Sequence, residues 1–440
     1  MKVMKFGGTS VGRPDRMQQV ADLATQQQEP VLLVLSALSG TTNALVEIGA
    51  ALAKANKELA ASLIDKLEAH YQAFIADLLP APTAHQAAQS IIEEHFGFLR
   101  IILKISFSES ISKDILAQGE LLSTKLFCVF LQDKGIDHTF LPALDFMSID
   151  ANDEPELSLI GNRLQAILKK GEQKKLYVTQ GYICRNHKGE VDNLKRGGSD
   201  YTASLIAAAL NASVCEIWTD IDGMHNNDPR VVNKTFPIEQ LSFDEAAELA
   251  YFGAKILHPA SIWPAQQCQV PVKLLNTMEP GAKGTLIDAK PAAAGVKAVA
   301  AKDNIIAIRI KSSRMLLAYG FLRKIFEVFE KYRTPIDMIT TSEVAVSLTI
   351  DTDQHLSSIM QELEPFGSIE VDKQQTIVCL VGHEIATTPS ILSKVATAVG
   401  QIPVRMISYG GSPHNITMLV PAAQKTNLLQ QLNTAVFGLS

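Results

Sequence analysis

Short apolar, β-rich runs alternate with helical stretches through the first two thirds of this 440-residue chain, and this alternation constrains its fold more than any other feature. The predicted strands span residues 2–6, 31–36, 176–179, 214–218 and 270–275. The helical patterns between them span residues 16–27, 44–79, 116–130, 200–210 and 243–251. Such alternation predicts an α/β fold with a mostly parallel sheet sandwiched by helices. The Ala- and Leu-rich stretch from about residue 44 to 130 has almost no strand pattern, so we expect an inserted helical lobe there.

The pattern changes after a Gly- and Pro-rich segment at 278–291, which indicates a domain boundary. Beyond it we predict strand 305–310, helix 320–332, strand 344–350, helix 356–363, a hairpin-like pair of strands at 369–371 and 376–381 around 373–375, helix 390–399, strands 404–409 and 415–420, and helix 425–436. Two successive β-α-β-β-α-β-like units predict a duplicated ferredoxin-like module. The expected domains are therefore 1–290, 303–374 and 375–440, the last with a strand from about 296–302.

Composition narrows the class of protein. The net charge of −6 and the lack of long like-charge runs argue against a nucleic-acid partner. No apolar run approaches the roughly 18 residues of a membrane span, and the chain opens on a strand pattern where a signal peptide would have an apolar helix. The five cysteines are scattered without metal-ligand spacing. We therefore expect a soluble, cytoplasmic protein with reduced thiols, no metal-ligating set of its own side chains and no membrane partner.

Residues 5–12 read K-F-G-G-T-S-V-G and begin within the first predicted strand. Gly7 and Gly8 leave backbone N–H groups uncovered and let them approach an anion closely. Lys5, on the strand itself, adds a point charge at the same place. The first and last glycines have P-loop spacing, but Arg13 stands where a P-loop needs its lysine. The run therefore predicts a phosphate site that is not a P-loop.

A second run, K-R-G-G-S-D-Y-T-A at 195–203, precedes an Ala-rich helix. Ser199 is a natural N-cap, and the glycines before it let the helix N-terminus present N–H groups to a negative ligand. Arg196 offers a planar fork suited to a carboxylate, and Asp200 is placed to orient a lysine or a metal-bound water. An ordinary helix cap with a glycine turn explains the glycines and Ser199, but it leaves Arg196 beside Asp200 unexplained.

A third run, W-T-D-I-D-G-M-H-N-N-D-P-R at 218–230, leaves a predicted strand and becomes a loop. Thr219 and Asp220 stand at the carboxyl end of that strand, where open α/β sheets bind ligands. The Asp-Pro pair predicts a turn that projects Arg230. A plain polar turn is the alternative interpretation.

Three further runs carry polar residues at informative places. S-A-L-S-G-T-T-N at 36–43 ends the second strand. Glu120 stands on an otherwise apolar helix, so it either lies on a solvated face or meets a ligand ammonium group. A capping box beginning at Ser242 starts a helix that Gly253 ends, and Lys255 follows among apolar neighbours. This placement would bring a second ammonium group, besides that of Lys5, to the site from a distant part of the sequence.

Together these runs resemble the aspartokinases of the amino-acid kinase superfamily, almost from end to end. K-F-G-G-T-S, R-G-G-S-D-Y-T-A, W-T-D…D-P-R and F-G-A-K-I-L-H-P-A occur in this order. The tail is similar to the paired ACT modules of the lysine-sensitive, single-chain members, with G-F-L at 320–322, I-T-T-S-E at 339–343 and S-Y-G-G-S…H-N at 408–415. The resemblance implies an amino-acid kinase fold followed by two ACT modules. It also implies phosphorylation of the L-aspartate side chain by ATP with Mg²⁺, giving 4-phospho-L-aspartate, the entry to lysine, threonine and methionine biosynthesis.

The same resemblance implies roles for individual residues. Catalysis falls to Lys5, Gly8, Asp200 and Lys255, with Asp200 orienting the lysines that stabilise the transferred phosphoryl group. Aspartate binding falls to Ser39, Thr42, Glu120, Tyr182, Arg196, Gly198 and Ser199, with Arg196 on the α-carboxylate and Glu120 on the ammonium group. ATP binding falls to Gly7, Gly8, Thr219, Asp220, His225, Arg230 and Lys255. Because the acceptor carboxylate is already ionised at neutral pH, the reaction needs no general base.

The tail also matches a lysine-binding pattern, at Met315, Gly320, Leu322, Asp337, Ser342 and Glu343. Leu317 and Ala318 replace a polar His-Ser pair of that pattern, so an amino-acid effector is expected, with L-lysine as the first candidate. Two other departures from the family are Lys195 in place of a glycine and Tyr182 in place of a phenylalanine. Since ACT modules commonly bury sheet edges or faces against another copy, a homodimer or a dimer of dimers is expected.

Two other interpretations stay in view. A related kinase would act on glutamate, acetylglutamate or UMP, but the paired tail modules and the combination of Glu120 with Arg196 argue against it. A catalytically silent amino-acid sensor would have lost Lys5, Asp200 or Lys255, and all three are present. A fused homoserine dehydrogenase is not expected, because no dinucleotide fingerprint follows the second module.

Overall fold

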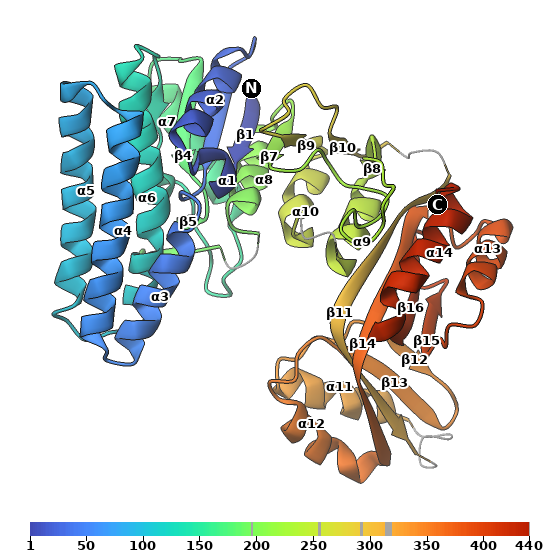
Figure 1. Cartoon of the computed structure of the whole chain (residues 1–440). Helices are drawn as coiled ribbons and strands as arrows, with labels where there is room; N and C mark the ends of the chain where they lie inside the picture. The colour runs from blue at the N-terminus through green and yellow to red at the C-terminus, as the bar shows by residue number, and fades with distance from the viewer. Residues whose placement is uncertain (195–196, 254–256, 291–293, 313–318, 440) are drawn as a thin grey trace. The chain divides into compact units, whose positions relative to one another are not determined.

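The computed structural model describes residues 1–194, 197–253, 257–290, 294–312 and 319–439 (Figure 1). The chain divides into two compact units, Met1–Met224 with Leu257–Ala289, and His225–Ile256 with Lys290–Ser440. The stretch 225–256, which the sequence placed in the first domain, therefore groups with the second unit. Its helix α9 (Phe243–Phe252) ends at Gly253, where a Cβ would lie only 2.3 Å from the carbonyl oxygen of Ala301.

The first unit is built on a mostly parallel sheet, as predicted. Its strands run in the spatial order β3 (Thr139–Phe140), β4 (Leu176–Gln180), β2 (Val31–Leu35), β1 (Lys2–Phe6), β7 (Cys215–Thr219), β9 (Val272–Asn276) and β10 (Thr285–Asp288). The pairs from β3 to β9 are parallel, whereas β10 pairs antiparallel with β9. All residues of β2 and β4 are buried, as expected for strands covered on both faces. The sequence analysis missed β3, which has only two residues, and β10, which lies in the Gly- and Pro-rich boundary segment.

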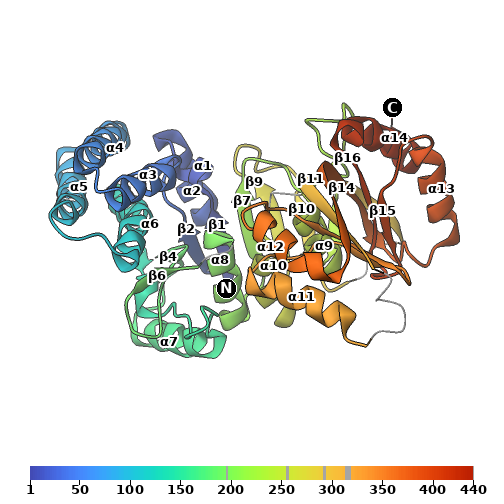
Figure 2. The same ribbon diagram turned by 90° about the horizontal axis from the view of Figure 1, so that it is seen from below.

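Helices cover both faces of this sheet (Figure 2). One face packs against α2 (Pro14–Thr25) and the predicted helical lobe, which consists of α3 (Thr41–Ala53), α4 (Lys57–Leu78), α5 (Pro82–Ile102) and α6 (Glu109–Asp133). The other face meets α8 (Gly198–Leu210), flanked by α7 (Leu157–Lys170) and α10 (Pro259–Gln267). The helical pattern predicted over 44–79 is two helices, since Asn56 caps α4 by accepting the N–H of Leu59.

The second unit contains a six-stranded antiparallel sheet in the order β12 (Ile339–Thr341), β13 (Ala345–Ile350), β11 (Gly295–Lys311), β14 (Ser368–His383), β16 (Asn415–Pro421) and β15 (Met406–Tyr409). Helices α11 (Phe321–Lys331) and α12 (Leu356–Leu363) belong to one half of it, and α13 (Pro389–Val399) and α14 (Lys425–Phe437) to the other. Each half has its own apolar core. These halves are the two ferredoxin-like units that the sequence predicts, joined through β11 and β14.

The hairpin predicted around 373–375 is wrong, because β14 is one continuous strand through that region. The polar residues there imitate a turn, and Gln374 has a positive φ of 58°. However, the pairing with β11 only shifts register between Lys302 and Ile305 and between Ile305 and Ala307. Such irregularities bend a strand without ending it. The bend lies where β14 passes from the first half of the sheet to the second.

Among the described residues, no helix combines the length and the apolar character that crossing a bilayer requires.

Candidate active site

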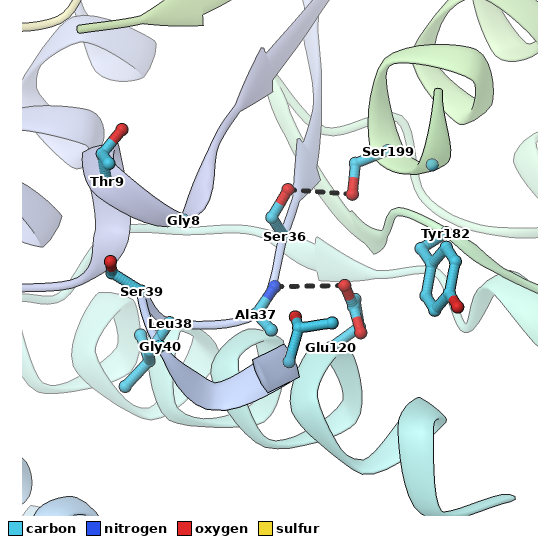
Figure 3. A pocket seen from close by; sticks show the side chains of 12 residues that line it. Gly8, Thr9, Ser36, Ala37, Leu38, Ser39, Gly40, Glu120, Tyr182 and Ser199 are labelled. Carbon is cyan, nitrogen blue, oxygen red and sulfur yellow. Dashed lines mark hydrogen bonds between the residues drawn. The ribbon is translucent and has the colours of Figure 1, made fainter. Parts of the chain in front are cut away.

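A pocket of about 460 Å³ opens at the carboxyl ends of β1, β2 and β4 (Figure 3). This is the edge at which parallel α/β sheets bind ligands. The residues that line the pocket are Gly8, Thr9, Ser36, Ala37, Leu38, Ser39, Gly40, Thr42, Glu120, Tyr182, Gly198 and Ser199. The structure therefore brings six of the seven predicted aspartate-binding residues together; the seventh, Arg196, lies outside the described residues.

Lys5 and Asp200 form an ion pair beside this pocket, with 2.6 Å between Lys5 Nζ and Asp200 Oδ1. Side chains alternate along β1, so Lys5 points to the face of α8 while Met4 and Phe6 enter the core on the other side. A Cβ on Gly7 would lie 3.4 Å from Lys5 Nζ, so the ammonium group rests against the glycine loop. The predicted partner Lys255 lies outside the described residues.

The glycine loop packs closely on the segment that follows β2. A Cβ on Gly8 would lie 2.9 Å from the carbonyl oxygen of Ala37, and one on Gly12 would lie 2.8 Å from Ser39 Cβ. Only glycine permits these approaches without displacing backbone. Segment 7–12, which includes the short helix α1 (Gly8–Val11), and the predicted run 36–43 therefore form one wall of the pocket.

Glu120 reaches the pocket from α6 and is only 4% exposed, so the solvated-face interpretation is wrong. Its Oε1 accepts the N–H of Ala37 at 3.3 Å, whereas Oε2 has no hydrogen-bond partner within the described part of the chain (Figure 3). Burial raises the pKa of the Glu120 carboxyl to about 8, although the Ala37 N–H and the charge of Lys5 act in the opposite direction. The site thus holds a buried acid with one oxygen available for a cation.

Ser199 is not the N-cap of α8. Gly197, with a positive φ of 68°, occupies that position, and Ser199 lies in the first turn, where its Oγ accepts a hydrogen bond from Ser36 Oγ at 2.8 Å (Figure 3). Gly181 makes this approach possible, since a Cβ there would lie 2.4 Å from Ser199 Oγ. Sequence analysis marked the run that begins at Ser36 but gave Ser36 itself no role, and it missed Gly181. A glycine two residues after the predicted strand 176–179 is the signal that would have found Gly181.

Tyr182 follows with a positive φ of 66°, an unusual conformation for an aromatic residue. Its N–H donates to Thr202 Oγ1 and its carbonyl accepts the N–H of Leu194, both at 2.8 Å. Burial, with smaller contributions from Glu120 and Asp192, raises the pKa of the phenol to about 12. These contacts hold the ring as a neutral wall of the pocket.

The predicted ATP-binding residues fall in both units. Thr219 ends β7, and its hydroxyl donates to Asp220 Oδ1 at 3.1 Å. His225 and Arg230 belong to the second unit, where His225 Nδ1 lies 2.8 Å from Thr235 Oγ1. The turn before Arg230 does not leave its guanidinium free. Two of the guanidinium nitrogens donate to the two oxygens of Asp228, each at 2.9 Å, and this hydrogen bonding holds the pKa of Asp228 below its usual range.

The predicted effector residue Asp337 is already paired within the second unit. Its Oδ1 accepts hydrogen bonds from Lys302 Nζ and Tyr251 Oη, each at 2.7 Å, and its side chain is 1% exposed. An internal ammonium group, that of Lys302, therefore pairs with the carboxylate that the lysine-binding pattern assigns to an effector. Asp337 Oδ2 has no hydrogen-bond partner among the described residues.

The other predicted effector residues that the structure describes lie in different elements of the second unit. Gly320 precedes α11 with a positive φ of 76°, and Leu322 lies in that helix. The backbone N–H of Ser342 donates to the carbonyl of Ala345 at 2.9 Å, and Glu343 is exposed. Met315, Leu317 and Ala318 lie outside the described residues, as does Lys195 in the first unit.

No group of three His, Cys, Asp or Glu side chains among the described residues is arranged to hold a metal ion. A magnesium ion that arrives with nucleotide phosphates needs only one or two carboxylates from the protein. Asp200 supplies an acidic side chain at the site, so the residues present fit such an ion.

Comparison with known proteins agrees with this geometry. Residues 1–276 match the amino acid kinase family and residues 378–436 match an ACT domain, which together define a kinase of this class with a regulatory-type tail. The lysine-sensitive aspartokinase 3 of Escherichia coli K12 is 33% identical over 449 aligned residues, covering 99% of both chains. The crystal structure of E. coli aspartokinase III with aspartate and ADP, in the R-state, has a TM-score of 0.85 at 32% identity and covers 99% of this chain and 100% of that one. Its complex with lysine and aspartate, in the T-state, has a TM-score of 0.80 at 31% identity and covers 99% of each chain. The chain belongs to the aspartokinases of the amino acid kinase family.

Proposed function

We propose that the protein transfers the γ-phosphoryl group of ATP to the side-chain carboxylate of L-aspartate, giving 4-phospho-L-aspartate for lysine, threonine and methionine biosynthesis. One observation carries the choice of acceptor. The pocket presents a buried carboxylate, Glu120, with an unpartnered oxygen, and the Lys5–Asp200 pair lies against the adjoining glycine loop. An amino acid with an ammonium group at one end and an anionic acceptor at the other matches that polarity. The E. coli relative solved with aspartate and ADP supports the same assignment.

The chemistry asks the protein for positioning and charge neutralisation. An aspartate carboxylate is ionised at neutral pH and attacks without losing a proton. Lys5 would neutralise charge on the transferred phosphoryl group, while Asp200 holds its ammonium in place at 2.6 Å. The N–H group of Gly8, at the start of the short helix α1 (Gly8–Val11), would face the phosphates. The predicted second donor, the Gly7 N–H, already donates to the Trp218 carbonyl at 3.4 Å. Glu120 would bind the substrate ammonium, and Ser39 and Thr42 would line the side of the pocket.

The remaining roles come from the family resemblance. We propose that Arg196 binds the α-carboxylate of aspartate and that Lys255 supplies a second cation to the phosphoryl group. Thr219, Asp220, His225 and Arg230 would bind ATP. Magnesium bound with ATP would offset the phosphate charge. Asp200 is the acidic side chain that would hold this ion at the site.

The direct test is a hydroxamate assay with ATP, Mg²⁺ and L-aspartate, because hydroxylamine traps an acyl phosphate. We expect aspartyl hydroxamate to accumulate only when all three are present. L-glutamate, N-acetylglutamate and UMP serve as alternative acceptors in parallel reactions. Activity with one of these acceptors and none with L-aspartate would overturn the proposal.

We further propose that an amino-acid effector, L-lysine first, acts on the ACT modules. The modules would be residues 303–374 and residues 375–440 with 296–302. This division cuts both β11 and β14, so that one part of each strand belongs to each module. The E. coli relative solved with lysine and aspartate supports the choice of effector. Repeating the hydroxamate assay with lysine, threonine and methionine tests it, and inhibition by threonine alone would reject lysine.

Finally, we propose that the protein assembles as a homodimer or a dimer of dimers. Strands β12 and β15 are the edges of the sheet in the second unit, and Ile339, Ile407 and Tyr409 on them are exposed apolar side chains. Exposed edges of this kind readily pair with another copy. Light scattering at micromolar concentration should give at least twice the 47.8 kDa of one chain. A monomer would contradict the proposal.

A further inference from the structure

A largely buried ion pair joins α6, which carries Glu120 of the pocket, to a hairpin that follows Tyr182 of the pocket. Lys113 Nζ, on α6, lies 2.6 Å from Asp192 Oδ2, on β6 (Val191–Asn193). The Asp192 side chain is only 1% exposed, and its Oδ1 also accepts the N–H of Asn193 at 2.8 Å. Two other acids act on Lys113, namely Glu109, which is well exposed and 4.0 Å away, and Asp153, whose effect is smaller still. Asp192 is therefore the main partner of this lysine.

Each partner is connected directly to a side chain of the pocket. Lys113 precedes Glu120 on α6 by seven residues, or about two helical turns, so the two side chains emerge on the same side of the helix. Asp192 lies on the hairpin of β5 (Ile183–Arg185) and β6, opposite Cys184 in the ladder. That hairpin begins immediately after Tyr182, and the N–H of Leu194 closes it by donating to the Tyr182 carbonyl at 2.8 Å.

A pair of this kind is better suited to fixing geometry than to adding stability. The free energy lost when two charges leave water offsets much of the free energy gained from their attraction. Replacing both members of a buried pair with apolar residues is therefore often neutral for stability. A short bond between a lysine and a carboxylate nonetheless sets one separation between the two backbones that carry them. Partial burial works against the charged lysine, but the hydrogen bond and charge of Asp192 outweigh it and raise the pKa of Lys113. Burial, followed by the charge of Asp192, raises the pKa of the neighbouring Cys184 thiol to about 12, so that thiol stays neutral.

We propose that Lys113 and Asp192 are positioning residues for aspartate binding, and that their ion pair fixes the distance between Glu120 and Tyr182 across the pocket. The inference rests on the proposed function of this pocket. Neither residue lines the pocket, so both act through the residues that do. The hairpin also leads in sequence toward Gly198 and Ser199, which makes its placement relevant to the opposite wall.

The test compares Lys113→Met and Asp192→Asn with wild type in the hydroxamate assay, with calorimetric titration of aspartate and thermal unfolding alongside. We expect KM and Kd for aspartate to rise by about tenfold to a hundredfold, as a small misplacement of binding groups allows. KM for ATP should stay within about twofold of wild type, because the pair adjoins the amino-acid end of the site. Lys113→Arg keeps the charge and should restore aspartate binding to within about threefold.

Lys2→Met is the matched control. Lys2 Nζ lies 2.7 Å from Glu216 Oε1 in another largely buried pair, but at the start of β1, at the end of the sheet opposite the pocket. We expect it to lower Tm without changing KM for aspartate. The proposal is overturned if Lys113→Met and Asp192→Asn change KM for aspartate no more than Lys2→Met does.

The same data separate this inference from the proposed function. A wild-type enzyme that makes no aspartyl hydroxamate but uses another acceptor would refute aspartate as the substrate. The variants are then compared with that acceptor, and an unchanged KM for it would overturn the positioning role as well. Asp192→Asn is nearly isosteric, so it provides the comparison if Lys113→Met does not fold.

Discussion

At the scale of single residues, the most consequential property of the pocket is the state of Glu120. Its carboxylate has one backbone N–H for a partner and an unpartnered oxygen, in a place from which water is almost excluded. Without a bound cation the neutral form is favoured, which is why burial lifts its pKa to about 8. A substrate ammonium group would supply the missing charge. Binding of aspartate and loss of the Glu120 proton should therefore be coupled.

This coupling predicts a pH dependence. Below pH 8 the free enzyme carries a protonated Glu120, so kcat/KM for aspartate should rise about tenfold per pH unit toward pH 8 and level off above it. The measurement is a steady-state profile of kcat/KM for aspartate between about pH 6 and 9. Glu120→Gln should bind aspartate weakly and give a flat profile. A wild-type profile that is flat between about pH 6 and 8 would contradict the coupling.

The same shift affects stability, and its sign follows from linkage. The folded state keeps a proton that the unfolded chain has lost between the ordinary pKa of 4.5 and about 8. The free energy of unfolding of the substrate-free enzyme should then fall as pH rises through that window, by up to about 1.4 kcal/mol per pH unit from this group. Glu120→Gln should remove this contribution, so its Tm relative to wild type should be higher at the top of the window than at the bottom. An equal difference at both ends would show that Glu120 titrates normally.

Lys5 gives a second prediction at this scale. Its ammonium lies against Gly7 and is held by Asp200 at 2.6 Å, which is a preorganised charge for a phosphoryl group. Lys5→Met should lower kcat by roughly a hundredfold to a thousandfold, as loss of one such electrostatic partner does. Lys2→Met, on the same strand, is the control and should leave kcat unchanged. Activity of Lys5→Met within about tenfold of wild type would remove Lys5 from the catalytic set.

At the scale of elements, hydrophobic periodicity predicted β1, β2, β4, β7 and β9 to within a few residues, because buried strands leave strong local patterns. It missed the two-residue strand β3 and the helices α7 and α10. Two other errors came from interactions between distant residues. Polar residues 373–375 look like a turn, yet β11 holds β14 as one strand. Ser199 has the chemistry of an N-cap, yet Gly197 takes that position and Ser36 binds the serine.

In the candidate site, too, local features were predictable from sequence and contacts between distant residues were not. Gly7, Gly8 and Lys5 belong to one short run, and that run alone predicts a phosphate site. In contrast, Lys113 and Asp192 are far apart in sequence, and nothing in the sequence around either residue identifies the other as its partner. Glu120 left two interpretations open because periodicity does not distinguish a solvated face from a ligand pocket. Its burial depends on how α6 packs against the segment after β2.

Gly181 supplies a prediction about how elements meet. It lies between β4 and Tyr182, and a Cβ there would overlap Ser199 in the first turn of α8. Gly181→Ala should push α8 away, destabilise the fold by about 1–3 kcal/mol and raise KM for aspartate. Gly97→Ala is the matched control, since a Cβ at Gly97 in α5 meets nothing within 4 Å. It should be neutral or stabilising by up to about 1 kcal/mol. Unchanged KM in Gly181→Ala would show that α8 tolerates the shift.

At the scale of the whole molecule, the two modules of the second unit share their longest strands. Residues 306–311 of β11 pair with β13 in one module, while β11 also pairs along its length with β14, which pairs with β16 in the other. Lys302 lies at the register shift between the two halves of β11. From there it binds Asp337 and Asp351 of the first module, and its ammonium lies 4.7 Å from the Tyr251 ring centroid on α9. One side chain thus joins the shared strand, the first module and α9.

This arrangement predicts how an effector amine acts. An incoming ammonium group that binds Asp337 Oδ1 must displace Lys302, which can retain Asp351 at 3.0 Å. Lys302→Met removes the internal competitor. Because a charged hydrogen bond contributes roughly 1.5–3 kcal/mol, the lysine concentration for half-maximal inhibition should fall by about tenfold or more. Asp337→Ala should abolish lysine inhibition while leaving uninhibited turnover nearly intact.

The measurement is a lysine inhibition curve for each variant at fixed aspartate and ATP, with calorimetric titration of lysine as an activity-independent check. Lys425→Met is the matched control. It removes the ion pair with Asp303, the residue next to Lys302 on β11, but from the side of the second module. Its lysine curve should coincide with that of wild type. If Lys302→Met gives that same curve, or one displaced to higher lysine, then Lys302 does not compete with the effector, and the Asp337 carboxylate is a structural anchor for α9 through Tyr251.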